Sequence, residues 1–162
     1  MAYSLLADIE NIRTFAKSVD SLLGVVPQMI TPMLGHDPVL QSSVAAALNQ
    51  TTPSFQWIVR KTVPIMLCIA WEGFVEELKV VDAARYAANF PAGFEKYHTE
   101  DIREVFLLRN CIVHCMGKID QGYLTQSLIK TFTVVGTPID FNDVQLGTQF
   151  KLFGDAYSKI TT

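Results

Sequence analysis

The longest apolar run in the chain covers residues 63–71, with the sequence VPIMLCIAW. In a helix these side chains point in every direction, and a helix that is apolar all round must be covered on every side. Crossing a bilayer needs about 20 such residues, so this run is too short to be a membrane segment. It predicts a helix in the middle of a helical bundle, and therefore an all-α fold.

Size and charge narrow the class of protein further. A length of 162 residues is typical of one domain, so we expect a single domain over residues 1–162. The formal net charge is −3, so any contact with nucleic acid would need a local basic cluster. The mean hydropathy of +0.24 is high, and a partner subunit would be a natural cover for the apolar surplus.

The cysteines and the N-terminal segment bear on the compartment. There are three cysteines, an odd number with no turn-rich framework around them, which favours reduced thiols in a cytoplasmic protein. Asp8 and Glu10 interrupt the first apolar stretch, which argues against a secretory or transit segment. We therefore expect a cytoplasmic protein without a membrane contact.

Apolar spacing predicts helices over the first half of the chain. The pattern over residues 4–23 is that of an amphipathic helix that stops at Gly24, with a proline-containing connector over 25–35. Asp37 and Pro38 suit the start of a short helix that ends near residue 49. The central helix is expected from Thr62 as its cap to about Ala88.

The second half is less regular. Thr99 is a capping residue for a helix that runs through Met116 and stops at Gly117. A further helix is predicted over 121–130 and a closing helix over 143–160. Between them, residues 131–135 and 139–141 are expected to form a short β-hairpin.

The helix that begins after Thr99 carries the candidate site. Its segment 105–116 reads VFLLRNCIVHCM, and only Arg109, Asn110 and His114 interrupt a stretch that is otherwise apolar or cysteine. A buried guanidinium without partners is prohibitive, so these polar groups must be paired or must line a cleft. If these groups are paired, Arg109 is the partner of a buried carboxylate and His114 is a core or interface histidine.

Helix geometry sets how these groups can act together. Arg109 and His114 lie roughly 140° apart around the axis, whereas Asn110 and His114 share one stripe that Lys118 would extend. One copy therefore presents a polar edge, and two copies packed face to face could join two such edges in one cleft. On RNA, His114 would be the acid–base group and Arg109 the phosphate clamp for attack of a 2′-hydroxyl on the adjacent phosphate.

Two segments resemble the HEPN domains of the RiboL-PSP-type branch. R-N-x-x-x-H at the end of an apolar helix is similar to the R-x(4–6)-H motif, and Trp71 to Leu78, WEGFVEEL, looks like the W-E-x-[FY]-x-E-x-L segment of that branch. Arg109 and His114 match the motif directly, and Asn110 matches the polar residue after the arginine. Cys115 departs from the asparagine that often follows the histidine.

The resemblance implies an HEPN-like helical bundle that dimerises through the Arg109–His114 helix. Many such proteins are metal-independent endoribonucleases, often toxins or defence effectors that an antitoxin or regulatory protein controls. RNA would then be the substrate, and no cofactor or metal is expected. Glu72, in the upstream segment, would orient Arg109. Other members of the family are non-catalytic modules that dimerise or bind a partner or a nucleotide, which is the main alternative.

A metal site is a further alternative. Cys111, His114 and Cys115 can share a helix face, and Cys68 would be a fourth ligand. Structural zinc sites usually space their cysteines two to four residues apart in loops, whereas thiols in apolar helices are more often core residues. The sequence therefore favours the metal-free site.

Overall fold

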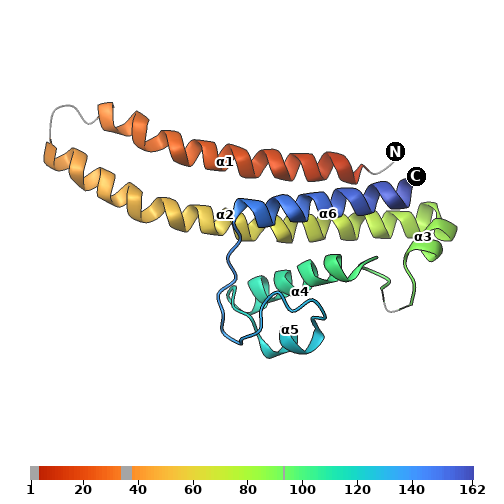
Figure 1. Ribbon diagram of the computed structural model, residues 1–162. Coiled ribbons are helices and arrows are strands. Elements are labelled where there is room, and N and C mark those ends of the chain that lie inside the picture. The colour runs from red at the N-terminus through yellow and green to blue at the C-terminus, as the bar shows by residue number, and fades with distance from the viewer. Residues whose placement is uncertain (1–3, 34–37, 93) are drawn as a thin grey trace.

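The computed structural model describes residues 4–33, 38–92 and 94–162, and within these ranges the chain forms six helices and no strand (Figure 1). This confirms the all-α prediction. The helices are α1 (Leu5–Met33), α2 (Pro38–Val81), α3 (Ala83–Asn89), α4 (Glu100–His114), α5 (Gln121–Gln126) and α6 (Asp143–Thr161).

The second half of α2 lies at the centre of the bundle, where α1, α4 and α6 all contact it. Its buried residues begin at Val59 and include Trp71, whose ring packs against Phe74 and Phe153. The Trp71 indole Nε1 donates a hydrogen bond to the Lys96 carbonyl at 2.8 Å. The run 63–71 is therefore the central helix that its apolar sequence predicts.

Both long helices continue past the points at which they were expected to end. α1 does not end at Gly24 but runs to Met33, and α2 does not end near residue 49 but is unbroken from Pro38 through Pro53 and Pro64 to Val81. A proline keeps a helical φ and loses one backbone hydrogen bond, so a helix that packs against a neighbour can contain it. Thr62 is consequently no cap: its Oγ1 donates to the Ile58 carbonyl within α2. The Asp37 cap lies outside the described residues.

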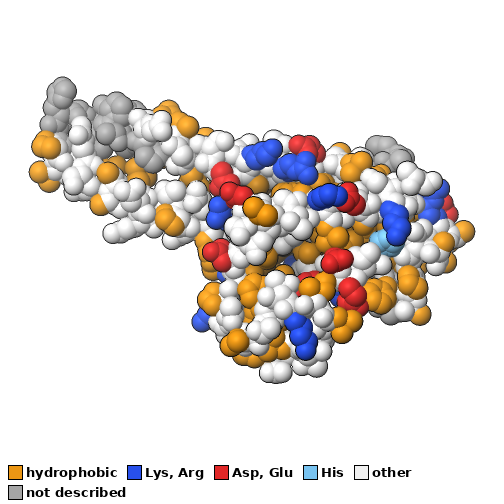
Figure 2. All heavy atoms as spheres, viewed as in Figure 1, with side chains coloured by type: hydrophobic (Ala, Val, Ile, Leu, Met, Phe, Trp, Pro, Cys, Tyr) orange, Lys and Arg blue, Asp and Glu red, His pale blue; other side chains and the backbone are white. Residues whose placement is uncertain are grey.

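The outer halves of α1 and α2 extend beyond the rest of the bundle as a two-helix arm (Figure 1). Residues 21–33 and 38–59 contain no charged side chain, and none of the side chains between 38 and 58 is buried. Figure 2 shows apolar side chains over this part of the surface. Its large exposed apolar residues are Leu22, Val25, Met29, Val39, Leu40, Phe55, Trp57 and Ile58. Much of the apolar surplus of the composition is therefore in this arm.

Within the described ranges, no helix combines the length and the apolar character that crossing a membrane requires.

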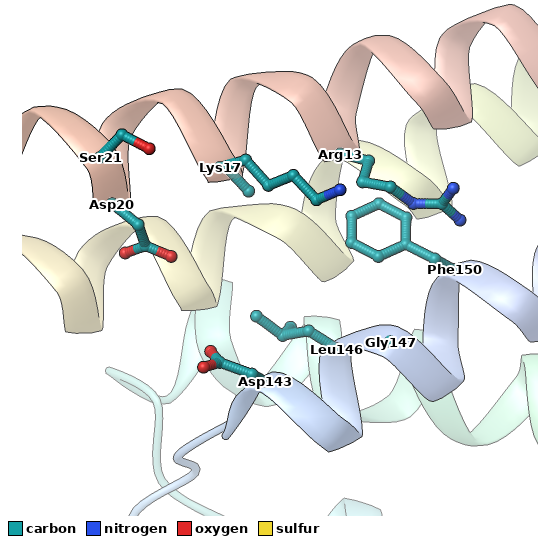
Figure 3. Close-up of a pocket in the computed structure, with 9 residues that line it drawn as sticks. Arg13, Lys17, Asp20, Ser21, Asp143, Leu146, Gly147 and Phe150 are labelled. Carbon is teal, nitrogen blue, oxygen red and sulfur yellow. The ribbon is translucent and has the colours of Figure 1, made fainter.

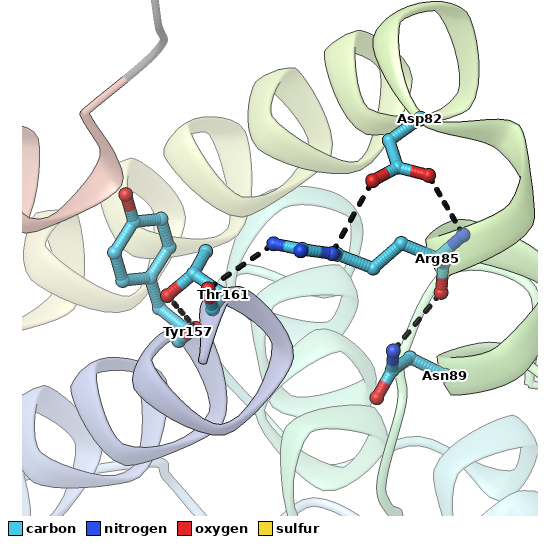
Figure 4. Close-up of polar contacts among 5 residues, drawn as sticks. All are labelled: Asp82, Arg85, Asn89, Tyr157 and Thr161. Atoms are coloured by element: carbon cyan, nitrogen blue, oxygen red, sulfur yellow. Dashed lines mark hydrogen bonds and ion pairs between the residues drawn. The ribbon is translucent and has the colours of Figure 1, made fainter.

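The helix expected to run to Ala88 is interrupted at Asp82. The Asp82 carboxylate accepts a hydrogen bond from the Arg85 backbone N–H at 3.0 Å and caps α3, while the Arg85 guanidinium donates to the Thr161 carbonyl at 3.1 Å (Figure 4). An aspartate satisfies the free N–H groups of a new helix start, which favours a break at this position. These contacts tie α3 to the end of α6.

α4 begins where its sequence predicts, because Thr99 Oγ1 accepts a hydrogen bond from the Ile102 N–H. It ends at His114, two residues before the predicted end at Met116. Met116 and Gly117 both have a positive φ, and the Gly117 N–H donates to the Cys111 carbonyl at 3.1 Å. This hydrogen bond satisfies a carbonyl of the last turn, and the two residues with a positive φ turn the chain away from the helix.

The predicted β-hairpin is wrong. Residues 131–135 and 139–141 do not pair with each other; instead Ile119 donates to the Thr137 carbonyl and Ile139 donates to the Gly117 carbonyl. The only bridge in the described ranges joins Lys118 to Pro138, which has no N–H to continue a ladder. α5 covers only the first part of the helix predicted over 121–130. α6 matches the predicted closing helix and begins with an Asn142 capping box.

Candidate functional site

Arg109, Asn110 and His114 lie in the last two turns of α4. Arg109 is half-buried, whereas Asn110 and His114 are exposed. The Arg109 Nη1 donates a hydrogen bond to the Asn110 Oδ1 at 3.0 Å. One direct contact therefore joins two members of the predicted polar edge.

A cavity of about 240 Å³ lies between α4 and α5, and Asn110 and His114 both line it. The structure thus places these two residues together on one side of α4, as their spacing of four predicts. The other lining residues are Leu107, Cys111, Cys115, Asp120, Gly122, Tyr123 and Gln126. This cavity contains an imidazole, a carboxamide and a carboxylate that can contact a polar ligand.

Arg109 does not line that cavity, and its charge acts on a residue of α2 instead. The charges of Arg109 and Glu72 both act on the pKa of the Cys68 thiol, which burial raises far above its ordinary value; Arg109 lowers it and Glu72 raises it. The Arg109 Nε is shielded from solvent and has no hydrogen-bond partner among the described residues. The charge of Arg109 thus acts on a residue of α2, and Arg109 is not among the residues that line the cavity.

Glu72 was predicted to orient Arg109. None of the ion pairs of the described residues joins the two side chains, although the charges of both affect the pKa of Cys68. Glu72 also lines a separate cavity of about 270 Å³ with Val75, Glu76 and Lys96. Its role in orienting Arg109 stays a prediction.

Lys118 was expected to extend the Asn110–His114 stripe past the helix end. The chain turns at Met116 and Gly117 instead, and the Lys118 N–H donates to the Cys115 carbonyl at 3.1 Å. Lys118 is exposed and is not among the residues that line the α4–α5 cavity. The turn therefore separates Lys118 from the stripe.

Asp120 is a cavity residue that sequence reasoning missed. It caps α5, and its Oδ1 accepts a hydrogen bond from the Tyr123 N–H at 2.7 Å, the main reason that the pKa of its carboxyl lies below the ordinary value. The Cys115 thiol donates to Oδ2 at 3.3 Å and the Cys111 thiol donates to Oδ1 at 3.5 Å. An aspartate just before a helical segment is a capping signal, but its contact with α4 depends on the turn at Gly117.

The two thiols of the cavity are held in their protonated form. Burial raises the pKa of Cys111 to about 11, and the hydrogen bond to Asp120 raises the pKa of Cys115. Across the described part of the chain, no group of three or more His, Cys, Asp or Glu side chains is placed to hold a metal ion. Cys68 is a buried residue of α2 that does not line the cavity, so the four-ligand set of the metal alternative is not assembled.

A buried carboxylate holds α5, which forms one wall of the cavity, against α4. Glu104 of α4 accepts hydrogen bonds from the Tyr123 hydroxyl, from the Ser127 hydroxyl at 2.6 Å and from the Thr131 N–H at 3.4 Å. The Tyr123 hydroxyl in turn accepts from the Phe132 N–H at 3.2 Å. Because a buried carboxylate needs several donors, this network fixes α5 and the loop after it against α4.

No family model, no curated protein sequence and no solved structure matches this chain. The HEPN resemblance therefore depends on the two sequence segments alone. The structure adds the arrangement of their residues within an all-α fold.

Proposed function

We propose that the chain is a metal-independent endoribonuclease of the HEPN type, whose site is completed by a second copy packed against α4. The observation that carries the proposal is that Asn110 and His114 line the same cavity and that Arg109 donates a hydrogen bond to Asn110. An imidazole, a carboxamide and a guanidinium are groups that can move a proton and bind a phosphate.

In this proposal the two copies divide the acid and base roles. The imidazole of one His114 takes the proton of a ribose 2′-hydroxyl, and the oxygen attacks the adjacent phosphorus. The 5′-oxygen leaves with a proton from the imidazolium of the second His114, which yields a 2′,3′-cyclic phosphate and a 5′-hydroxyl. Arg109 stabilises the charge that develops on the phosphate, and Asn110 donates to the same oxygens.

The exposed end of α4 offers an apolar contact for the second copy. Val113 is exposed in the last turn, and Met116, just beyond it, is 88% exposed. Large apolar side chains at a dimer interface become buried on association. A dimer through this end would bring two His114 side chains close together, and it would also cover these two residues.

RNA cleavage by the purified full-length chain tests the proposal. We expect cleavage of single-stranded RNA in the presence of EDTA, with 2′,3′-cyclic phosphate ends, and its loss in His114→Ala and in Arg109→Ala. Arg103→Ala is the matched control, because it removes a cation from the same helix at a residue paired with Glu100. Cleavage that persists unchanged in both site variants contradicts the assignment.

The proposal extends to the biological role: the chain would act in the cytoplasm as a toxin or defence effector, and an antitoxin or regulatory protein would control it. The three cysteines are free, which suits a reducing compartment. Expression of the wild-type chain should then slow growth of the host cells, and expression of His114→Ala at the same level should not. Equal growth in both cultures contradicts the toxin role.

One observation favours the alternative of a non-catalytic HEPN module that dimerises or binds a partner or nucleotide. The guanidinium of Arg109 is already bonded to Asn110 and acts on Cys68, so in the single chain it is not directed at the cavity. For such a module, α4-mediated dimers form but RNA stays intact. Sedimentation of the wild type and Val113→Glu beside the RNA assay separates the two functions.

A further inference from the structure

A second and larger cavity, of about 690 Å³, lies between α1 and α6 (Figure 3). Its volume falls within the range of small-molecule sites, roughly 300–1,000 Å³. Its lining residues include Arg13, Lys17, Asp20, Asp143, Leu146 and Gly147, none of which lines the α4–α5 cavity. We call this cavity the α1–α6 groove.

The charges of the α1–α6 groove are separated into two ends. Arg13 and Lys17 lie toward one end, and Asp20 and Asp143 lie at the other, with Leu146 and Gly147 on the α6 side (Figure 3). Seven residues along α1 separate Arg13 from Asp20, which corresponds to about 10 Å. The groove is therefore dipolar, with apolar surface along its length.

The basic end combines two different cations. The Arg13 guanidinium lies 5.1 Å from the centroid of the Phe150 ring and is paired with Glu10 at 2.8 Å, so it is held in place. Lys17 is exposed and takes part in none of the ion pairs found in the described ranges. Its ammonium is thus available to an anionic group.

The acidic end contains an unsatisfied acceptor. Asp20 Oδ1 is shielded from solvent and accepts no hydrogen bond from the residues that the structure describes, and Figure 3 shows this carboxylate on the side of α1 that faces α6. A shielded acceptor without a donor is costly, so a ligand N–H at this position would remove a penalty. Asp143 lines the same end, where its carboxylate is paired with the Arg60 guanidinium at 3.0 Å, which leaves Asp20 as the unpaired acid among the described residues of this end.

Gly147 keeps the groove open on the α6 side. A Cβ at this position would meet no heavy atom within 4 Å, and the residue does not have a positive φ. Neither close packing nor an unusual backbone conformation therefore requires glycine here, although glycine in a helix interior costs about 1 kcal/mol relative to alanine. Its effect is to leave space.

We propose that the α1–α6 groove binds a linear zwitterion. The ammonium or guanidinium group of the ligand contacts Asp20 and Asp143, its carboxylate contacts Lys17 and Arg13, and its middle lies along Leu146 and Gly147. The spacing of about 10 Å along α1 between Arg13 and Asp20, the outer charges of the groove, fits an ω-amino acid with a long chain or an extended peptide of three residues, and Lys17 lies between these two charges. The inference does not depend on the proposed ribonuclease activity.

Titration of the ¹⁵N-labelled full chain with two probes tests the ligand class and its source. The probes are 8-aminooctanoate, with an aliphatic middle, and trialanine, with an amide middle. We expect saturable shifts of backbone amide signals in α1 and α6 with at least one probe, and the tighter probe identifies the source. Octanoate, octylamine and N-acetyl-trialanine each lack one of the two charges. Each should bind more weakly than its zwitterion by a factor of about five or more. No saturable shift with either probe, or equal binding of the single-charge compounds, overturns the proposal.

A pair of glycine variants tests the location. Gly147→Leu places a side chain in the groove and should weaken probe binding at least tenfold, while its melting temperature stays equal or rises. Gly154→Leu is the matched control: it is in the same helix, its Cβ also meets nothing within 4 Å, and it does not line the groove. Binding retained by folded Gly147→Leu, or lost equally in both variants, overturns the assignment to this groove.

Charge variants provide the second readout. Lys17→Glu should weaken 8-aminooctanoate or trialanine binding by about fivefold or more and should leave octylamine binding unchanged or stronger. Asp20→Asn should weaken the same zwitterion and should leave octanoate unaffected. Zwitterion binding that is unchanged in both variants overturns the proposed orientation.

Discussion

Lys61 of α2 donates a hydrogen bond to the backbone carbonyl of Gly117, with its Nζ 3.4 Å from that oxygen. The Lys61 side chain is only 5% exposed, and its ammonium lies 3.5 Å from the centroid of the Trp57 ring. Burial lowers the pKa of Lys61, and the charge of Asp140 acts in the opposite direction. Because Gly117 directly follows the last turn of α4, this contact attaches the end of the candidate-site helix to the central helix.

The first prediction compares two glycines that both have a positive φ, Gly117 at 71° and Gly136 at 82°. An added Cβ would lie 2.2 Å from the Lys61 Nζ at Gly117 but would meet nothing within 4 Å at Gly136. We expect Gly136→Ala to lower the free energy of unfolding by about 1 kcal/mol through backbone strain, and Gly117→Ala by about 2–3 kcal/mol because Lys61 must also move. Urea unfolding of the two variants measures the difference, and equal losses would refute the role of Lys61.

The second prediction concerns the buried carboxylate of Glu104. Glu104→Ala removes the acceptor of Tyr123, Ser127 and Thr131, so we expect a loss of about 2–4 kcal/mol in the free energy of unfolding. Asp155→Ala, which breaks an exposed pair with Lys151, should cost less than about 0.5 kcal/mol. Amide hydrogen exchange should become faster in α5 in the Glu104 variant only. A Glu104 variant as stable as the Asp155 control would contradict the network.

The sequence predicts the starts of α4 and α6 better than the ends of α1 and α2. Thr99 caps α4 as expected, because a side-chain cap is a local signal, and α6 begins at the expected Asp143, directly after its Asn142 cap. Gly24 and Pro53 do not stop α1 and α2, because the contact between these two helices compensates for a local cost of about 1–3 kcal/mol. Such tertiary compensation cannot be recognised from a window of a few residues.

The residues of the candidate site also differ in how far the sequence predicts their positions. Asn110 and His114 share a cavity because a spacing of four is a property of any helix. Asp120 joins them only because the chain turns back at Met116 and Gly117, and the charge of Arg109 acts on Cys68 of α2 because α4 packs against that helix. Contacts set by a turn or by helix packing need the fold, so the sequence could indicate the stripe but not the complete cavity.

The third prediction separates the structural roles of Arg109 and His114. Arg109 is half-buried with its Nε shielded, whereas His114 is exposed at the end of α4. We expect Arg109→Ala to lower the free energy of unfolding by about 1–2 kcal/mol, and His114→Ala to change it by less than about 0.5 kcal/mol. Thermal unfolding of both variants measures this. A larger loss in His114→Ala would mean that His114 is a packed interface residue of the folded state.

The last prediction is the pH dependence that Cys111 confers. Folding raises the pKa of its thiol from 9.0 to about 11, mainly because burial disfavours the thiolate. The unfolded chain therefore loses this proton first, so the contribution is complete below pH 9 and decreases as the pH rises toward 11. Cys111→Ser keeps a donor for Asp120 but does not titrate in this range. The stability difference between the wild type and Cys111→Ser should thus shift by about 2 kcal/mol, in favour of the variant, between pH 9 and 11. Urea unfolding at several pH values measures this difference, and parallel profiles would show that Cys111 is not shielded from solvent.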